Sequence, residues 1–97
     1  MTTVNDSLQF PGDLVAAKVP ELRLQLRALV DGSDVHTIVL DFSNVRMVDS
    51  IGIGLLISVH NTLRKAGREL SAIRVSKDIF ELFRTLRLHQ HFSISKD

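Results

Sequence analysis

The sequence predicts an α/β fold with about four strands in one mixed or largely parallel sheet and three main helices packed against it. Two observations favour this class. Short segments rich in β-branched residues alternate along the chain with longer segments whose apolar residues recur at helical spacing. The segment 36–42 also contains an unbroken apolar run over 38–40, which is typical of a central strand covered on both faces.

The first predicted elements are a strand over 7–10 and a helix that begins near Pro20. A Pro-Gly pair, a strong turn signal, closes the strand. Proline suits the first turn of a helix, and the Asp-Gly pair at 31–32 suits its end. The apolar face of this helix consists of Val19, Leu22, Leu26 and Leu29.

After the central strand we expect a helix over 49–66, a strand over 69–75 and a third helix that Ser76 caps. The alternating segment 91–95 is predicted to be a last strand at the edge of the sheet. In the two helices the expected core faces are Ile53, Leu56, Ile57 and His60, and then Ile79, Leu82, Phe83 and Leu86.

Composition indicates one domain over residues 1–97, because 44% hydrophobic residues can form a buried core. The 12 basic and 11 acidic residues are scattered and give a net charge of +1, so nucleic acid is not an expected partner. The absence of cysteine excludes disulfides and thiolate chemistry. No apolar stretch is long enough to cross a bilayer and the start lacks a signal peptide, so we expect a cytoplasmic protein without a membrane anchor.

The pair Asp49-Ser50, directly before the apolar helix, is the main candidate for a functional site. In the simplest interpretation Ser50 is the N-cap, and its hydroxyl accepts a hydrogen bond from an early amide of the helix. Gly52 and Gly54 then let the helix pack closely on the sheet.

A nucleophilic serine is the second interpretation. Ser50 and Gly52 provide half of the hydrolase elbow motif, but Val48 stands where that motif has glycine. The histidines at 36, 60, 89 and 91 show no arrangement that suggests a general base. This interpretation is the weakest of the three.

In the third interpretation Ser50 is a regulatory phosphorylation site. A phosphate adds about −1.5 to −2 charges at a helix N-terminus, where the peptide dipoles tolerate an anion. The fold would survive the modification, whereas a partner docked on this surface would meet like-charge repulsion from the phosphate and Asp49. It would also have to desolvate the phosphate next to the apolar Ile51. Phosphorylation would therefore release a partner without unfolding the domain.

The stretch TIVLDFSNVRMVDSIGIGLLI resembles the central signature of STAS domains, and specifically of bacterial anti-sigma-factor antagonists. The signature is an apolar strand that ends in Asp, a small polar residue, an Asp-Ser step and a glycine-rich helix start. The preceding GDLVAAKVPELRLQL and the later ELFRTLRLHQHFSI are similar to other parts of the family, so the resemblance covers about residues 12–94.

The resemblance implies that Ser50 is the phosphoacceptor and that Asp49 is the acidic residue before it. Asp41 matches the aspartate that closes the central strand, and Gly52 and Gly54 match the glycines of the helix start. It further implies binding to an anti-sigma factor of the ATP-dependent serine-kinase type while Ser50 is unphosphorylated. The kinase would release its antagonist by phosphorylating it, and a serine phosphatase would reset it; no catalysis and no cofactor are implied.

Some residues depart from the family pattern. Ile51 stands where a second serine is frequent, and Val15 stands where an aspartate is usual. Both ends are trimmed relative to the family, so a partner or a second copy of the chain, as in a homodimer, would cover an exposed sheet edge. The alternative function is a STAS adaptor that binds another cytoplasmic protein, for example a transporter ATPase, with Ser50 purely structural.

Around Ser50 we expect a partly exposed stripe that includes Ile51 and Leu55 and is extended by Met47. Together with Asp41, Asp49, Gly52 and Gly54 it forms the predicted switch surface. Asp41 is expected to accept hydrogen bonds from the turn 43–45 and to share in placing Asp49. The His-x-His pair at 89 and 91 is a weak metal candidate, for which a solvated tail is the preferred interpretation.

Overall fold

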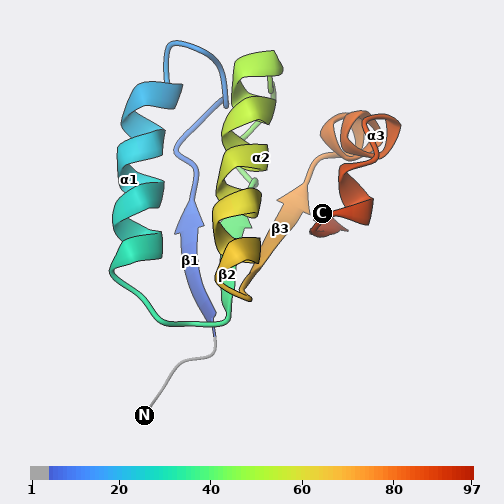
Figure 1. Ribbon diagram of the computed structural model, residues 1–97. Helices are drawn as coiled ribbons and strands as arrows, with labels where there is room; N and C mark the ends of the chain where they lie inside the picture. The colour runs from blue at the N-terminus through green and yellow to red at the C-terminus, as the bar shows by residue number, and fades with distance from the viewer. Residues whose placement is uncertain (1–4) are drawn as a thin grey trace.

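In the computed structural model, which describes residues 5–97, four strands form one sheet in the order β1-β2-β3-β4 (Figure 1). All three strand pairs are parallel. The predicted fold class is confirmed, and the last strand lies at the sheet edge as expected. No antiparallel pair occurs within residues 5–97, because a helix connects each strand to the next. The elements are β1 Asn5–Gln9, α1 Val19–Asp31, β2 Thr37–Asp41, α2 Ser50–Lys65, β3 Glu69–Val75, α3 Lys77–Thr85, the 3-10 turn η1 Leu88–Gln90 and β4 Ser93–Lys96.

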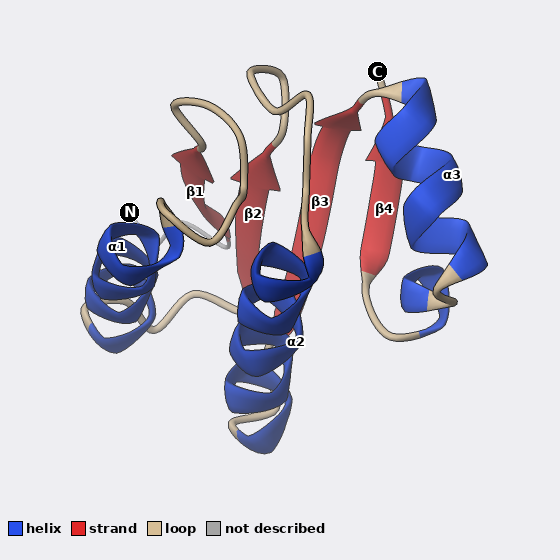
Figure 2. Ribbon diagram, turned by 90° about the horizontal axis from the view of Figure 1, so that it is seen from above, coloured by secondary structure: helices blue, strands red, loops and turns tan. Residues whose placement is uncertain are grey.

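The helices pack on one face of the sheet. Figure 2 shows α1 and α2 on the same side of the strands, with α3 beside β4. Strand order follows chain order, so right-handed crossovers that all advance in one direction place their helices on a common face. In β2, Ile38 and Leu40 are buried toward the helices, whereas Val39 on the opposite face is only half-buried. The expectation that this strand is covered on both faces was wrong within the described residues.

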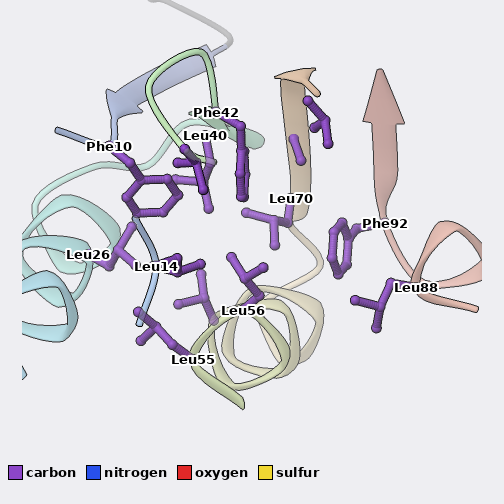
Figure 3. Packing of buried hydrophobic residues seen from close by; sticks show 14 of the residues in the cluster. Phe10, Leu14, Leu26, Leu40, Phe42, Leu55, Leu56, Leu70, Leu88 and Phe92 are labelled. Atoms are coloured by element: carbon purple, nitrogen blue, oxygen red, sulfur yellow. The ribbon is translucent and has the colours of Figure 1, made fainter. Parts of the chain in front are cut away.

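The core is apolar and closely packed. The rings of Phe10 and Phe42 meet edge to face at 5.1 Å, and those of Phe42 and Phe83 at 5.8 Å. Leu55 and Leu56 project from α2 into this core beneath the sheet (Figure 3). None of the helices formed by residues 5–97 is long and apolar enough to cross a membrane.

The face that α2 buries differs from the predicted one. Leu55 is 1% exposed, whereas Ile57, which was expected in the core, is 40% exposed. Because the stretch 51–57 is apolar at nearly every position, hydrophobic periodicity does not determine which side faces the sheet. The buried residues of α2 are Gly52, Leu55, Leu56, Val59 and Leu63.

Local signals placed the starts of the other two helices correctly, although Leu82 and Leu86, expected on the core face of α3, are exposed. Pro20 lies in the first turn of α1, and Ser76 caps α3 by accepting a hydrogen bond from the amide of Ile79 at 3.4 Å.

Candidate functional site at the start of α2

Two loops lie side by side where α2 begins, at the end of the sheet toward which the strands point (Figure 1). Leu14, between β1 and α1, forms a parallel bridge with Val48, between β2 and α2. The amide of Leu14 donates to the Met47 carbonyl at 3.0 Å, and the Leu14 carbonyl accepts from the amide of Asp49 at 3.2 Å. The segment before α1 therefore fixes the position of the first turn of α2.

The side chain of Asp13 adds a second connection between these loops. One of its oxygens, Oδ1, accepts hydrogen bonds from the amides of Arg46 at 2.9 Å and Met47 at 3.1 Å. This residue was not among those that the sequence singled out. Its place after a Pro-Gly turn is a local signal, because aspartate often accepts backbone hydrogen bonds in turns. Its partners, however, lie 33 and 34 positions away in the chain and could not be identified from sequence.

Asp49 holds both the helix and the neighbouring loop. Its Oδ1 accepts from the amide of Gly52 at 2.8 Å, and its Oδ2 accepts from the amide of Ala16 at 2.9 Å. The hydrogen bond from Gly52, followed by that from Ala16, lowers the pKa of this carboxyl below its ordinary value. Asp49 is therefore the N-cap of α2, and the interpretation of Ser50 as the cap was wrong.

Ser50 is the first residue of α2, and its side chain is exposed. Within the described part of the chain its hydroxyl makes no hydrogen bond, so the fold does not depend on it. The apolar neighbours Met47 and Ile51 are 60% and 51% exposed. A free hydroxyl thus lies between two exposed apolar side chains at the positive end of a helix.

The two glycines of the motif have different surroundings. Gly52 is buried, and a Cβ at this position would collide with the carbonyl oxygen of Leu14. Gly54 is exposed, and a Cβ there would meet no atom within 4 Å. The fold therefore requires the first glycine but not the second, although both were expected on the switch surface.

The residues that the structure exposes together at this end of α2 are Met47, Ser50, Ile51, Gly54 and Ile57, and from here on the switch surface means these five. Leu55 was predicted for this surface, but it is buried in the core.

Asp41 was also predicted for the switch surface, but it lies elsewhere, on the sheet face opposite the helices. Its carboxylate accepts hydrogen bonds from the amide of Ser43 at 2.8 Å and from Nη1 of Arg74 at 3.1 Å. Burial opposes ionisation, but the Ser43 hydrogen bonds and the Arg74 charge outweigh it and lower the pKa of Asp41. The expected bond to the turn is confirmed, whereas the expected share in placing Asp49 is not, because Asp49 is held by Gly52 and Ala16.

Among residues 5–97 no group of three His, Asp or Glu side chains is arranged to hold a metal ion. His89 and His91 are both exposed, so the predicted solvation of this pair is confirmed, although the buried Leu88 and Phe92 on either side hold the segment against the core. The ring of His91 lies 5.8 Å from that of His60 on α2.

Comparison with known sequences connects the chain to one domain type. Residues 1–95 match the family model described as "Mlab, STAS domain". Prestin of Mus musculus is 40% identical and prestin of Rattus norvegicus 36% identical, each over 55 residues. Each of these alignments covers 57% of this chain and 7% of the relative, so the chain matches only a small part of those proteins.

Solved structures share the fold at low sequence identity. A sulfate transporter family protein from Wolinella succinogenes has a TM-score of 0.78 at 13% identity, covering 98% of this chain and 80% of the other. The anti-sigma factor antagonist SpoIIAA in its unphosphorylated form has a TM-score of 0.71 at 21% identity, with 100% and 83% of the chains covered. The Bacillus cell fate determinant SpoIIAA in the phosphorylated form gives the same score and identity, with 100% and 88% covered.

Proposed function

Because the chain belongs to the STAS domain family, we propose that it acts as a non-enzymatic phosphoswitch, an anti-sigma-factor antagonist in the bacterial cytoplasm. It binds an anti-sigma factor with serine-kinase activity while Ser50 is unphosphorylated. Phosphorylation of Ser50 by that partner releases it, and a serine phosphatase restores binding.

The observation that carries the proposal is that the side chain of Ser50 is exposed and plays no part in the fold. Its hydroxyl is exposed and is not needed by the fold, since Asp49 already caps the helix. A kinase can therefore modify it without removing a structural hydrogen bond. The exposed Met47 and Ile51 beside it provide the apolar area on which a partner would dock.

Electrostatics explain how a phosphate would change this surface but not the fold. A phosphate at the first residue of α2 lies at the positive end of the helix dipole, which offsets part of its charge. Asp49 keeps its carboxylate ionised and bound to backbone amides, so it offers no donor to a phosphate. A docked partner would have to desolvate the phosphate against apolar side chains, which is costly. The fold likeness to SpoIIAA, the same for its unphosphorylated and phosphorylated forms, supports tolerance of phosphate by this architecture.

In the described part of the chain, the histidines that a hydrolase mechanism could use as a base lie away from Ser50. His60 lies ten residues further along the same helix, about 15 Å along its axis. His91 contacts His60, and His36 precedes β2 at the opposite end of that strand from the loop leading to Ser50. The distance of these histidines from Ser50 supports a role of the protein in binding rather than in catalysis.

The test has two stages. Phosphopeptide mapping of the protein from its own cells, grown with and without stress, is expected to find phosphate on Ser50 that changes with condition. The kinase that phosphorylates Ser50 is then identified from the same cells. Its affinity is measured for the purified wild type and for the Ser50→Ala and Ser50→Asp variants. We expect Ser50→Ala to bind like wild type and Ser50→Asp to bind at least about tenfold more weakly.

A matched control is Ser95→Asp, which adds the same charge at an exposed position of the edge strand β4. It should bind like wild type. Equal binding by the Ser50→Ala and Ser50→Asp variants would argue against a switch at this residue.

A second candidate is a STAS adaptor that binds another cytoplasmic protein, for example a transporter ATPase, with Ser50 unmodified. The likeness to the sulfate transporter family protein and to a short part of prestin favours it. In that case Ser50 carries no phosphate under any condition, and the kinase is not a partner.

A further inference from the structure

A hollow of about 670 Å³ lies at the far end of α2 from the switch surface. It opens because β3 begins at Glu69, two residues before Ser71, which is the first residue of β3 to pair with β4. The chain before β4 is therefore not paired with the first two residues of β3, and a gap remains there beside α2. The hollow is lined by His60 and Arg64 from α2, by residues 67–71 at the start of β3 and by residues 89–93 before and at the start of β4.

The lining contains two arginines and three histidines but only one carboxylate. Glu69 is the only carboxylate in it, and its side chain lies 3.6 Å from His36, which is not part of the lining. In the part of the chain that the structure describes, no carboxylate forms an ion pair with the basic or imidazole groups of the hollow. These groups are His60, Arg64, Arg68, His89 and His91.

The fold holds these groups close together. The rings of His60 and His91 lie 5.8 Å apart, and the ring of Phe92 lies 5.7 Å from that of His60. Burial, followed by the positive charges of His91 and Arg64, lowers the pKa of His60. Two arginines and three imidazoles from separate elements thus line one hollow, and none of them is ion-paired with a carboxylate among residues 5–97.

The two arginines of the hollow, Arg64 and Arg68, differ in their contacts. The guanidinium of Arg68 is anchored, since its Nε donates to the Val35 carbonyl at 2.8 Å and its Nη1 donates to the Val30 carbonyl at 3.1 Å. Arg64 makes no side-chain hydrogen bond or ion pair within residues 5–97. Arg64 and the imidazoles are therefore the more accessible donors for a ligand, whereas Arg68 is anchored and its buried Nη2 has no hydrogen-bond partner among residues 5–97.

We propose that this hollow binds a phosphate-class oxyanion, either inorganic phosphate or the phosphate group of a small molecule. Arginine and protonated imidazole form strong charge-assisted hydrogen bonds with such anions. The volume is in the range of ligand sites, and Phe92 provides an apolar wall for an attached organic group. Nothing in this proposal depends on the phosphoswitch, because it uses the opposite end of α2.

Protonation of the imidazoles should strengthen binding. The charged groups facing His60 are Arg64 on its own helix, His89 and His91 before β4, and Arg68 and Glu69 at the start of β3. An anion among them supplies the missing counter-charge, so its affinity rises as pH falls through the histidine range.

The first experiment titrates the full chain with sulfate at constant ionic strength, because sulfate keeps its double charge across the pH range. The histidine ring resonances report binding at about pH 6 and about pH 8. We expect saturable shifts of His60 and His91, with affinity at least about fivefold lower at the higher pH. Arg64→Gln should weaken binding about tenfold through loss of a charge-assisted hydrogen bond.

Lys65→Gln is the matched control, because it removes the same charge from the next residue, which does not line the hollow. Its affinity should equal that of wild type, and unchanged amide spectra would confirm that both variants are folded. Shifts that never saturate, or equal weakening by both substitutions, would overturn the proposal.

A final titration separates the two sources of phosphate. Inorganic phosphate and adenosine monophosphate are compared at the same pH. Tighter binding of the nucleotide identifies an organic ligand that uses the Phe92 wall, and equal binding identifies the phosphate group alone; failure of both to bind contradicts the proposal.

Discussion

The two ends of α2 present opposite kinds of surface. At its start, the carboxylates of Asp13 and Asp49 accept hydrogen bonds from backbone amides and leave an exposed hydroxyl at Ser50 among apolar side chains. At its end, His60 and Arg64 line a hollow whose positive charge has no ion pair within residues 5–97. An apolar docking surface changes most when a phosphate is attached to it, whereas a hollow lined by arginines and imidazoles suits an anion that binds and leaves. One helix can therefore support two different phosphate-dependent roles.

The largest expected change in stability distinguishes a core residue from a surface residue in the first half of α2. Leu55→Ala should lower the free energy of unfolding by about 3 kcal/mol, because the side chain is 1% exposed and its loss leaves a cavity. The control Ile51→Ala should change it by less than about 0.5 kcal/mol, since that side chain is 51% exposed. Urea unfolding measures both, and equal losses would contradict the assigned face of the helix.

The next effect distinguishes the two glycines. Gly52→Ala should lower the free energy of unfolding by about 2 kcal/mol or more, since its Cβ has no space beside the Leu14 carbonyl. Gly54→Ala should raise it by about 0.5–1 kcal/mol, because alanine is the better helix former and the position is open. Opposite signs in the same urea assay are the expected result. A loss of similar size at both positions would show that Gly54 also has a structural role.

Local sequence signals were sufficient for most of the fold. The caps, turn residues and periodic patterns predicted the helices and strands to within a few residues, including the Ser76 cap and the edge strand. They could not fix the face of α2, since an almost wholly apolar stretch has no polar side to mark solvent. They also could not decide between Asp49 and Ser50 as the cap, because both residue types serve equally well.

The parts of the sites that depend on distant pairing were beyond sequence reasoning. Asp13 meets Met47 only because the loops after β1 and β2 lie side by side. The hollow joins His60 to His91 across 31 positions, and its shape depends on where β4 begins. Such contacts follow from strand order and register, which the sequence does not state directly.

A smaller effect tests how the start of α2 is held. Asp49→Ala should lower the melting temperature at neutral pH by about 5 °C, because it removes a helix cap and a bond to the neighbouring loop. The folded-state pKa of Asp49 is lowered, so its contribution is present above the unfolded value, about 3.9, and is lost as pH falls through the folded value. The difference from wild type should therefore shrink in acid. Ser50→Ala should melt like wild type at every pH, and a matching loss would contradict the free hydroxyl.

The smallest effect concerns the other end of the helix. The pKa of His60 in the folded protein should lie below its ordinary value, about 6.5, mainly through burial and then through the charges of His91 and Arg64. The folded state favours the neutral ring, so the stability that it contributes is present above the unfolded value and is lost as pH falls toward the folded one. Arg64→Gln should raise the pKa of His60 in an NMR titration, and Lys65→Gln should raise it less. If Arg64→Gln leaves it unchanged, burial and His91 account for the lowered pKa without Arg64, and the charge contrast between the two ends of α2 is weaker than the geometry indicates.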